Sequence, residues 1–181
     1  MLHIFLTDLA AYNKGYLYGK WITLPCDNLQ EEVESILKAG EELCLRKCSY
    51  YEEHEEWFIT DYEWKNVALF DIDEYSDIYK LNQEMNLLDG LDKDTLKAIA
   101  FLLQQNIVTT LDDALNGVDD VIVHSGQTLT DVAYELIQEC YEVDKLPSII
   151  SNNIDYKAIA NELRHDGRYF EQQFDVIEYI G

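Results

Sequence analysis

Hydrophobic residues recur along the chain with the two spacings that are typical of strands and of helices. In the first part of the chain this pattern predicts, in order, a strand over 3–7, a strand through Trp21, a helix over 28–39 and a strand over 56–61. The apolar positions of the helix fall on one face, and Gly40 is expected to end it. The pattern therefore predicts a small α+β domain over residues 1–74.

The middle of the chain shows helical spacing only. It predicts a helix that ends near Gly90, a second helix that begins at Asp92 or Asp94, and a short third helix over 111–115. We expect these helices to form a middle domain over residues 75–117.

The last part of the chain mixes both spacings. It predicts a strand over 121–124, a helix from Thr128 or Thr130 to about Tyr141, a helix from Asp155 to Gly167, and a terminal hairpin over 168–170 and 174–180. These elements predict a C-terminal α+β domain over residues 118–181. The expected fold class is therefore α+β, with three small domains and small antiparallel sheets in the first and third.

The chain is strongly acidic, and this narrows the choice of partner. Its 181 residues include 36 Asp and Glu against 13 Lys and Arg, which gives a net charge of −23 at pH 7. Such a surface repels nucleic acid and anionic membranes, so we expect neither as a direct partner. Because no signal peptide or membrane-length apolar run is evident, a cytoplasmic protein with free thiols is expected.

The acidic residues alternate with apolar residues and do not form a tail, so we expect them on the outer faces of folded elements. The stretch between Lys97 and Lys145 contains no Lys or Arg at all. We predict that the exposed carboxylates form an acidic surface that binds a basic protein. The carboxylates of this surface are Glu52, Glu53, Glu55, Glu56, Asp61, Glu63, Asp112, Asp113, Asp119, Asp120, Asp131, Glu135, Glu139, Glu142 and Asp144.

No arrangement of residues in the sequence points to catalysis or to a bound cofactor. Gly15 and Gly19 are followed by a predicted strand, whereas a phosphate-binding glycine loop opens a helix. His124 and Ser125 are adjacent, but no nucleophile-elbow motif surrounds any serine. We therefore predict that the protein is not an enzyme and needs no cofactor.

Metal binding is not expected either. Cys44, Cys48 and His54 offer three zinc ligands, but three residues separate the cysteines and no fourth ligand is evident. The segment 71–82 resembles a calcium loop, yet Ser76 occupies the position that requires glycine and the final glutamate is missing.

Five apolar residues of the C-terminal part leave two interpretations open. They are either the core of a small domain or an exposed interface between two copies of the chain. They are Leu136, Ile137, Leu146, Ile149 and Ile150.

Four segments resemble, in order, the ArdA antirestriction family. The first is LTDLAAYNKGYLYGKW over residues 6–21, which is similar to the family's N-terminal signature LADLAAYNxGxLxGxW. The others are ITDYE at 59–63, DDVIVHSG at 119–126 and LPSIISNNIDYKAIANEL at 146–163. Together these segments extend over nearly the whole chain.

The resemblance implies a protein of mobile genetic elements or phages that evades host defence inside the bacterial cell. It implies an elongated homodimer of three-domain subunits, joined through the C-terminal domain. It also implies mimicry of B-DNA, by which the protein occupies the DNA-binding groove of type I restriction–modification enzymes. The alternative that the residues leave open is an acidic inhibitor of another DNA-binding machine, such as a CRISPR effector or a nucleoid protein.

Overall fold

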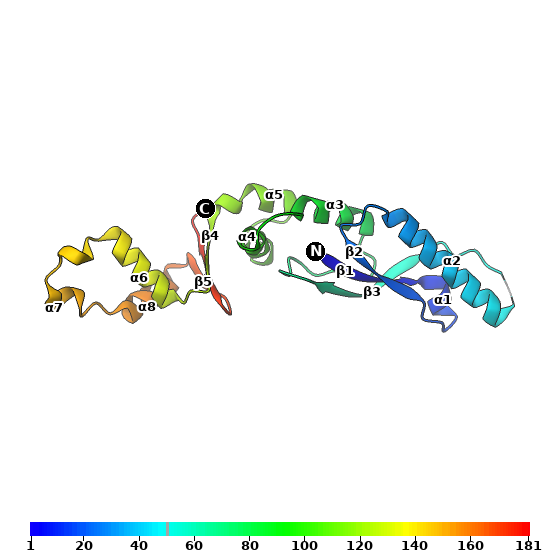
Figure 1. The fold of residues 1–181 in the computed structure, drawn as a ribbon, viewed down its shortest axis with the longest axis horizontal. Coiled ribbons are helices and arrows are strands. Elements are labelled where there is room, and N and C mark those ends of the chain that lie inside the picture. The colour runs from blue at the N-terminus through cyan, green and yellow to red at the C-terminus, as the bar shows by residue number, and fades with distance from the viewer. Residues whose placement is uncertain (50) are drawn as a thin grey trace. The chain divides into compact units, whose positions relative to one another are not determined.

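The computed structural model describes residues 1–49 and 51–181 and divides the chain into two compact units (Figure 1). Unit 1 comprises Met1–Lys93, and unit 2 comprises Asp94–Gly181. Each unit contains a small antiparallel sheet of three strands together with helices, so the predicted α+β class is confirmed. The division into three domains stays a prediction.

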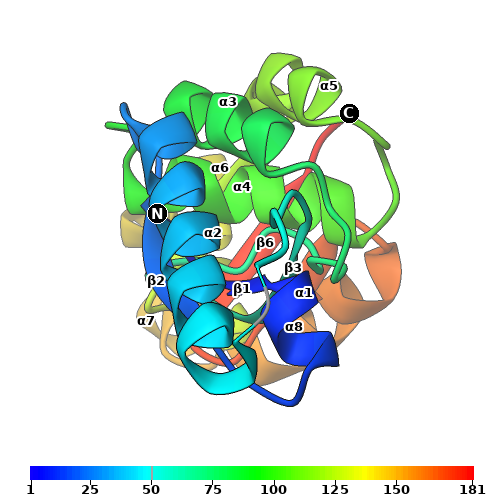
Figure 2. The ribbon, with the colours of Figure 1, turned by 90° about the vertical axis from the view of Figure 1, so that its right-hand side faces the viewer.

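The sheet of unit 1 has the strand order β2-β1-β3 and is antiparallel throughout. The elements of this unit are β1 (Leu2–Asp8), α1 (Leu9–Asn13), β2 (Gly19–Leu24), α2 (Leu29–Cys48), β3 (Trp57–Trp64) and α3 (Ile78–Leu88). Alternate residues of β1, namely Leu2, Ile4 and Leu6, are fully buried. The long helix α2 packs against β1 and β2 and covers this side of the sheet (Figure 2).

The helix α2 continues past Gly40 to Cys48, so the predicted helix end at Gly40 is wrong. Gly40 is buried, and a Cβ atom at this position would overlap Oδ2 of Asp8. The glycine therefore allows α2 to approach the end of β1 closely, and it does not terminate the helix. The helix ends instead at Ser49, which has a left-handed backbone conformation with φ 55°.

The substitution Gly40→Ala is expected to destabilise unit 1 by about 1–3 kcal/mol, because the added methyl group overlaps the buried Asp8 carboxylate. In an ordinary helix interior the same change stabilises by roughly 0.5–1 kcal/mol. Urea unfolding followed by tryptophan fluorescence checks this, since all three tryptophans lie in unit 1. Ser35→Ala, at an exposed position of the same helix, is the control and should be neutral or slightly stabilising.

The sheet of unit 2 has the order β4-β6-β5 and is also antiparallel. The helices and strands of this part are α4 (Lys93–Gln104), α5 (Leu111–Asn116), β4 (Val121–Ser125), α6 (Leu129–Cys140), α7 (Ser148–Ser151), α8 (Tyr156–Asp166), β5 (Tyr169–Glu171) and β6 (Asp175–Tyr179). Short 3-10 helices cover Val118–Asp120 and Val143–Lys145.

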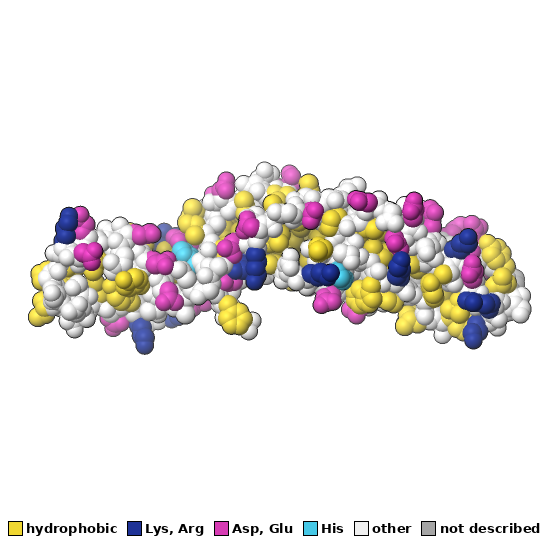
Figure 3. Space-filling model, viewed as in Figure 1, with side chains coloured by type: hydrophobic (Ala, Val, Ile, Leu, Met, Phe, Trp, Pro, Cys, Tyr) yellow, Lys and Arg dark blue, Asp and Glu magenta, His cyan; other side chains and the backbone are white. Residues whose placement is uncertain are grey.

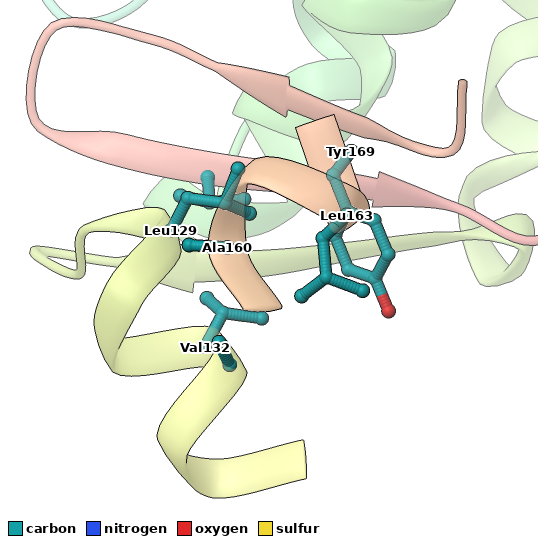
Figure 4. Close-up of a cluster of buried hydrophobic side chains, with 7 residues drawn as sticks. Leu129, Val132, Ala160, Leu163 and Tyr169 are labelled. Atoms are coloured by element: carbon teal, nitrogen blue, oxygen red, sulfur yellow. The ribbon is translucent and has the colours of Figure 1, made fainter. Parts of the chain in front are cut away.

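This sheet packs against helices on both of its faces. On one face α6 and α8 lie together and bury a cluster that includes Leu129, Val132, Leu163 and Tyr169 (Figure 4). On the other face Phe101 of α4 meets Phe170 of β5, with ring centroids 4.8 Å apart. Tyr169 and Phe170 are neighbours in one strand, and their side chains therefore point to opposite faces.

Local cap residues set the ends of the two packed helices, and of the two predicted starts of α6 the structure has Thr128. Thr128 accepts a hydrogen bond from the backbone of Asp131, whose side chain in turn accepts from the Thr128 backbone, which is a complete capping box. Asp155 caps α8 by accepting from the backbone of Ala158. Gly167, with φ 84°, ends α8 in the left-handed conformation that glycine adopts without strain.

Candidate acidic binding surface

All fifteen carboxylates of the predicted acidic surface are exposed. Figure 3 shows acidic side chains interspersed with hydrophobic ones on the visible face. Two of the fifteen form ion pairs: Glu52 with Lys14 at 2.5 Å, and Glu142 with Lys145 at 2.5 Å. Within residues 1–49 and 51–181, the other thirteen have no Lys, Arg or His partner within 4.0 Å. Most of this negative charge is therefore not neutralised inside the chain.

In unit 1 the predicted carboxylates fall in two places. Glu52, Glu53, Glu55 and Glu56 line a shallow hollow beside α1, together with Lys14. The hydrogen bond from Lys14 holds the pKa of Glu52 below its usual value, so this carboxylate stays charged. The second place is β3, where Asp61 and Glu63 are exposed.

In unit 2 four carboxylates lie on two short consecutive elements. Asp112 and Asp113 occupy the first turn of α5, which Thr110 caps by accepting a hydrogen bond from the Asp113 backbone at 3.1 Å. Asp119 and Asp120 belong to the 3-10 helix that leads into β4. Acidic residues in a first helical turn are favourable because the helix dipole is positive there.

Three further carboxylates form a row along α6. Asp131, Glu135 and Glu139 are exposed and follow one another at intervals of four residues. Because a helix rises about 1.5 Å per residue, such a row places one carboxylate roughly every 6 Å along one face. The hydrogen bonds from Thr128 hold the pKa of Asp131 below its usual value. Glu142 and Asp144 follow just after the helix and are also exposed.

The adjacent His124 and Ser125 have separate partners and do not form a nucleophile–base pair. His124 Nε2 lies 3.3 Å from Glu178 Oε2, whereas Ser125 Oγ donates to Asp94 Oδ1 at 2.5 Å and also contacts the ammonium group of Lys97. Burial lowers the pKa of Lys97, but the hydrogen bonds to Asp175 and Asp94 together outweigh this effect and raise it. A lysine held protonated in this way cannot take the proton of Ser125.

The Lys97 cluster is instead a structural contact of unit 2. Its ammonium group lies 2.9 Å from Asp175 of β6 and 3.1 Å from Asp94, and thereby joins α4 to the sheet. We expect Lys97→Met to destabilise unit 2 by about 2–3 kcal/mol, because the little-exposed Asp175 carboxylate loses its ion pair with Lys97.

Amide hydrogen exchange in β4 and β6 measures the effect of Lys97→Met. The matched control is Lys145→Met. It removes the lysine of an exposed ion pair with Glu142, which has the same i,i+3 spacing as the pair of Lys97 with Asp94. We expect this change to lower the free energy of unfolding by less than about 1 kcal/mol. If both variants lower the free energy of unfolding of unit 2 equally, burial of the Lys97 cluster contributes nothing to its stability.

The three residues considered as zinc ligands are engaged separately. Cys44 is buried in α2, and Cys48 is exposed, with its sulfur 3.7 Å from the Tyr16 hydroxyl. His54 Nδ1 lies 2.6 Å from Asp8 Oδ2, and both side chains are inaccessible to solvent. No group of three or more His, Cys, Asp or Glu arranged to hold a metal ion occurs in the described part of the chain.

The family model for the ArdA antirestriction protein matches residues 4–178. The chain belongs to the ArdA family. The match extends over both units, and it confirms the assignment made from the four sequence segments. Membership implies an antirestriction protein, which is an inhibitor of restriction. Among curated proteins, the search found no significant match.

For this ArdA chain, the five apolar interface candidates divide into two groups. Leu136 and Ile137 of α6 are half-buried, and Leu136 packs against the core of α6 and α8. Leu146, Ile149 and Ile150, in and just before α7, are exposed by 38%, 79% and 51%. The second group is thus the more accessible to a second copy. Separately, no helix among the described residues is both long and apolar enough to cross a membrane.

Sequence reasoning missed two polar clusters in this ArdA chain: the buried Asp8–His54 pair and the Lys97 cluster. The members of the first pair are 46 residues apart, and Lys97 and Asp175 come from different elements. One local sign was available for Asp8, because it stands directly before the short helix that it caps. No comparable sign pointed to His54, which lies between two pairs of glutamates.

Proposed function

We propose that the protein inhibits type I restriction–modification enzymes by presenting to their DNA-binding groove an acidic surface that mimics B-DNA. The observation that carries this proposal is the set of thirteen exposed carboxylates without a cationic partner in the described residues of an ArdA chain. A DNA-binding groove holds phosphates with Lys and Arg, and the same side chains can bind carboxylates.

The amount and spacing of the charge are compatible with mimicry. B-DNA carries one negative charge per about 1.7 Å of axis. Twice the chain's net charge of −23 is ~46, which equals the charge of roughly 78 Å of duplex. The row along α6 supplies a carboxylate roughly every 6 Å, so charge is repeated at a regular interval on at least one element.

The proposal includes a homodimer joined through the C-terminal region. Support comes from Ile149 and Ile150, which place two large apolar side chains in solvent within the short helix α7. Paired across a twofold axis, they would be removed from water. Light scattering at micromolar concentration should give the mass of a dimer for the native chain and of a monomer for Ile149→Asp. A monomeric native chain would contradict this part of the proposal.

A restriction assay tests the function itself. Unmodified plasmid is introduced into cells that carry a type I restriction system, with and without the protein, and transformants are counted. We expect the protein to restore transformation close to the level of a restriction-deficient host. In parallel, the purified protein should displace duplex DNA from the purified enzyme. Equal restriction in both strains, together with no displacement of DNA, would refute the proposal for that enzyme.

A further inference from the structure

The sheet of unit 1 has a second face, opposite α2, that carries an aromatic pair. Phe5 of β1 and Trp21 of β2 are directly opposite each other in the strand register. Their ring centroids are 5.3 Å apart, with the planes at 70°, which is an edge-to-face contact. Trp21 is 45% exposed, so a large part of the indole ring faces solvent.

A glycine holds the Phe5 ring of this pair in place. A Cβ atom at Gly19 would lie 2.7 Å from Cε1 of Phe5 and 2.5 Å from the Leu6 carbonyl oxygen. The Phe5 ring therefore rests on the bare backbone of Gly19, where any larger residue would displace it. The aromatic pair is thus fixed before any partner arrives, which reduces the entropy lost on binding.

Two carboxylates border the aromatic pair on the same face. Both belong to β3, the other neighbour of β1. In the register of β1 and β3, Phe5 is paired with Asp61, and His3, two residues before Phe5 and on the same face, is paired with Glu63. Both carboxylates are exposed, and neither has a cationic partner within the residues that the structure describes. Directly paired residues in antiparallel strands have Cβ atoms about 4.5–5.5 Å apart. One face therefore offers aromatic rings and negative charge within the span of a single long side chain.

We propose that this face binds an arginine side chain of a basic protein, with the guanidinium group stacked on Trp21 or Phe5 and hydrogen-bonded to Asp61 or Glu63. Arginine fits better than lysine, because its planar and weakly hydrated guanidinium stacks on aromatic rings and also donates in a fork to a carboxylate. The identity of the basic protein rests on the proposed function, in which it is the restriction enzyme.

Other occupants fit this face less well. Nucleic acid would bring its phosphates against Asp61 and Glu63 and against a chain with a net charge of −23. A purely apolar partner would remove both carboxylates from water without giving them a hydrogen bond. An arginine meets both the aromatic rings and the carboxylates, and for this reason the charge complementarity favours it.

The first test needs no restriction enzyme. The native protein is titrated with a hexa-arginine peptide and with a hexa-lysine peptide, and NMR spectra record the indole N–H signals, with that of Trp21 assigned from Trp21→Leu. The arginine peptide should shift the Trp21 indole and the amides of Asp61 and Glu63 at a lower concentration than the lysine peptide does. Shifts confined to α5 and α6, or equal responses to both peptides, would overturn the proposal.

The second test uses the restriction enzyme in competition with duplex DNA. Trp21→Ala should weaken binding roughly tenfold, and Trp21→Leu nearly as much, because leucine keeps apolar area but has no aromatic ring for the cation. Leu45→Ala is the matched control, since Leu45 is 44% exposed on α2, which covers the other face of the sheet. It should change binding less than twofold.

Thermal unfolding followed by circular dichroism verifies that each variant is folded, and a folded Trp21→Leu that binds like the native chain would overturn the assignment of arginine. The two tests also separate the two proposals. If the native chain does not displace DNA, the proposed function fails, and the peptide titration still decides whether the sheet face binds arginine.

Discussion

Replacing His54 with alanine is expected to lower the free energy of unfolding of unit 1 by about 3–5 kcal/mol. The His54 and Asp8 side chains are both fully inaccessible, and His54 Nδ1 donates to Asp8 Oδ2 at 2.6 Å. Asp8 Oδ1 accepts from the backbone of Ala11 at 2.9 Å. Removing the imidazole leaves a cavity and a buried carboxylate with one hydrogen bond lost, and both effects destabilise the folded state.

Tryptophan fluorescence in urea is a direct readout of His54→Ala, because all three tryptophans lie in unit 1. The matched control is His165→Ala, which removes an exposed histidine near the end of α8 in unit 2. It should leave this transition unchanged. If His54→Ala shifts the transition by less than about 1 kcal/mol, the buried pair does not hold β1, α1 and the segment before β3 together.

Features that depend on neighbouring residues could be predicted from the sequence. The sequence indicated Thr128 or Thr130 as the start of α6, and Asp155 and Gly167 as the two ends of α8. These positions follow from side chains that bond the backbone three residues away, or from a backbone conformation that glycine adopts easily. The exposure of the fifteen carboxylates followed from their alternation with apolar residues.

Features that depend on contacts between distant segments could not be predicted. Gly40 has the local appearance of a helix end, and only the approach of Asp8 from β1 explains why a glycine stands inside the helix. The same holds for the candidate site on the sheet face, since the register of β1 against β2 and β3 brings Phe5 beside Trp21 and Asp61. Register is set by the packing of whole strands, which a single sequence does not reveal residue by residue.

Neutralising four carboxylates of unit 2 together is expected to weaken binding to a type I restriction enzyme by roughly two to three orders of magnitude. The substitutions are to asparagine at Asp112, Asp113, Asp119 and Asp120. Each exposed charge contact contributes up to about 1 kcal/mol, so any one substitution alone should weaken binding only several-fold. The four carboxylates have no cationic partner in the described residues, and the full charge of each is therefore available to the enzyme.

A control with the same change of net charge separates local contacts from the overall field of the protein. It neutralises four carboxylates that are already paired with Lys or Arg: Glu32, Glu84, Asp166 and Glu171. These substitutions should weaken binding much less than the unpaired set, because the charge they remove is compensated within the chain. Both sets are measured by competition with duplex DNA at two salt concentrations, and the difference between them should shrink at high salt as screening increases.

If the paired set weakens binding as much as the unpaired set, only net charge matters. A single neutral substitution that abolishes inhibition in a folded protein would instead mean that one contact, and not a distributed DNA-like surface, carries the function.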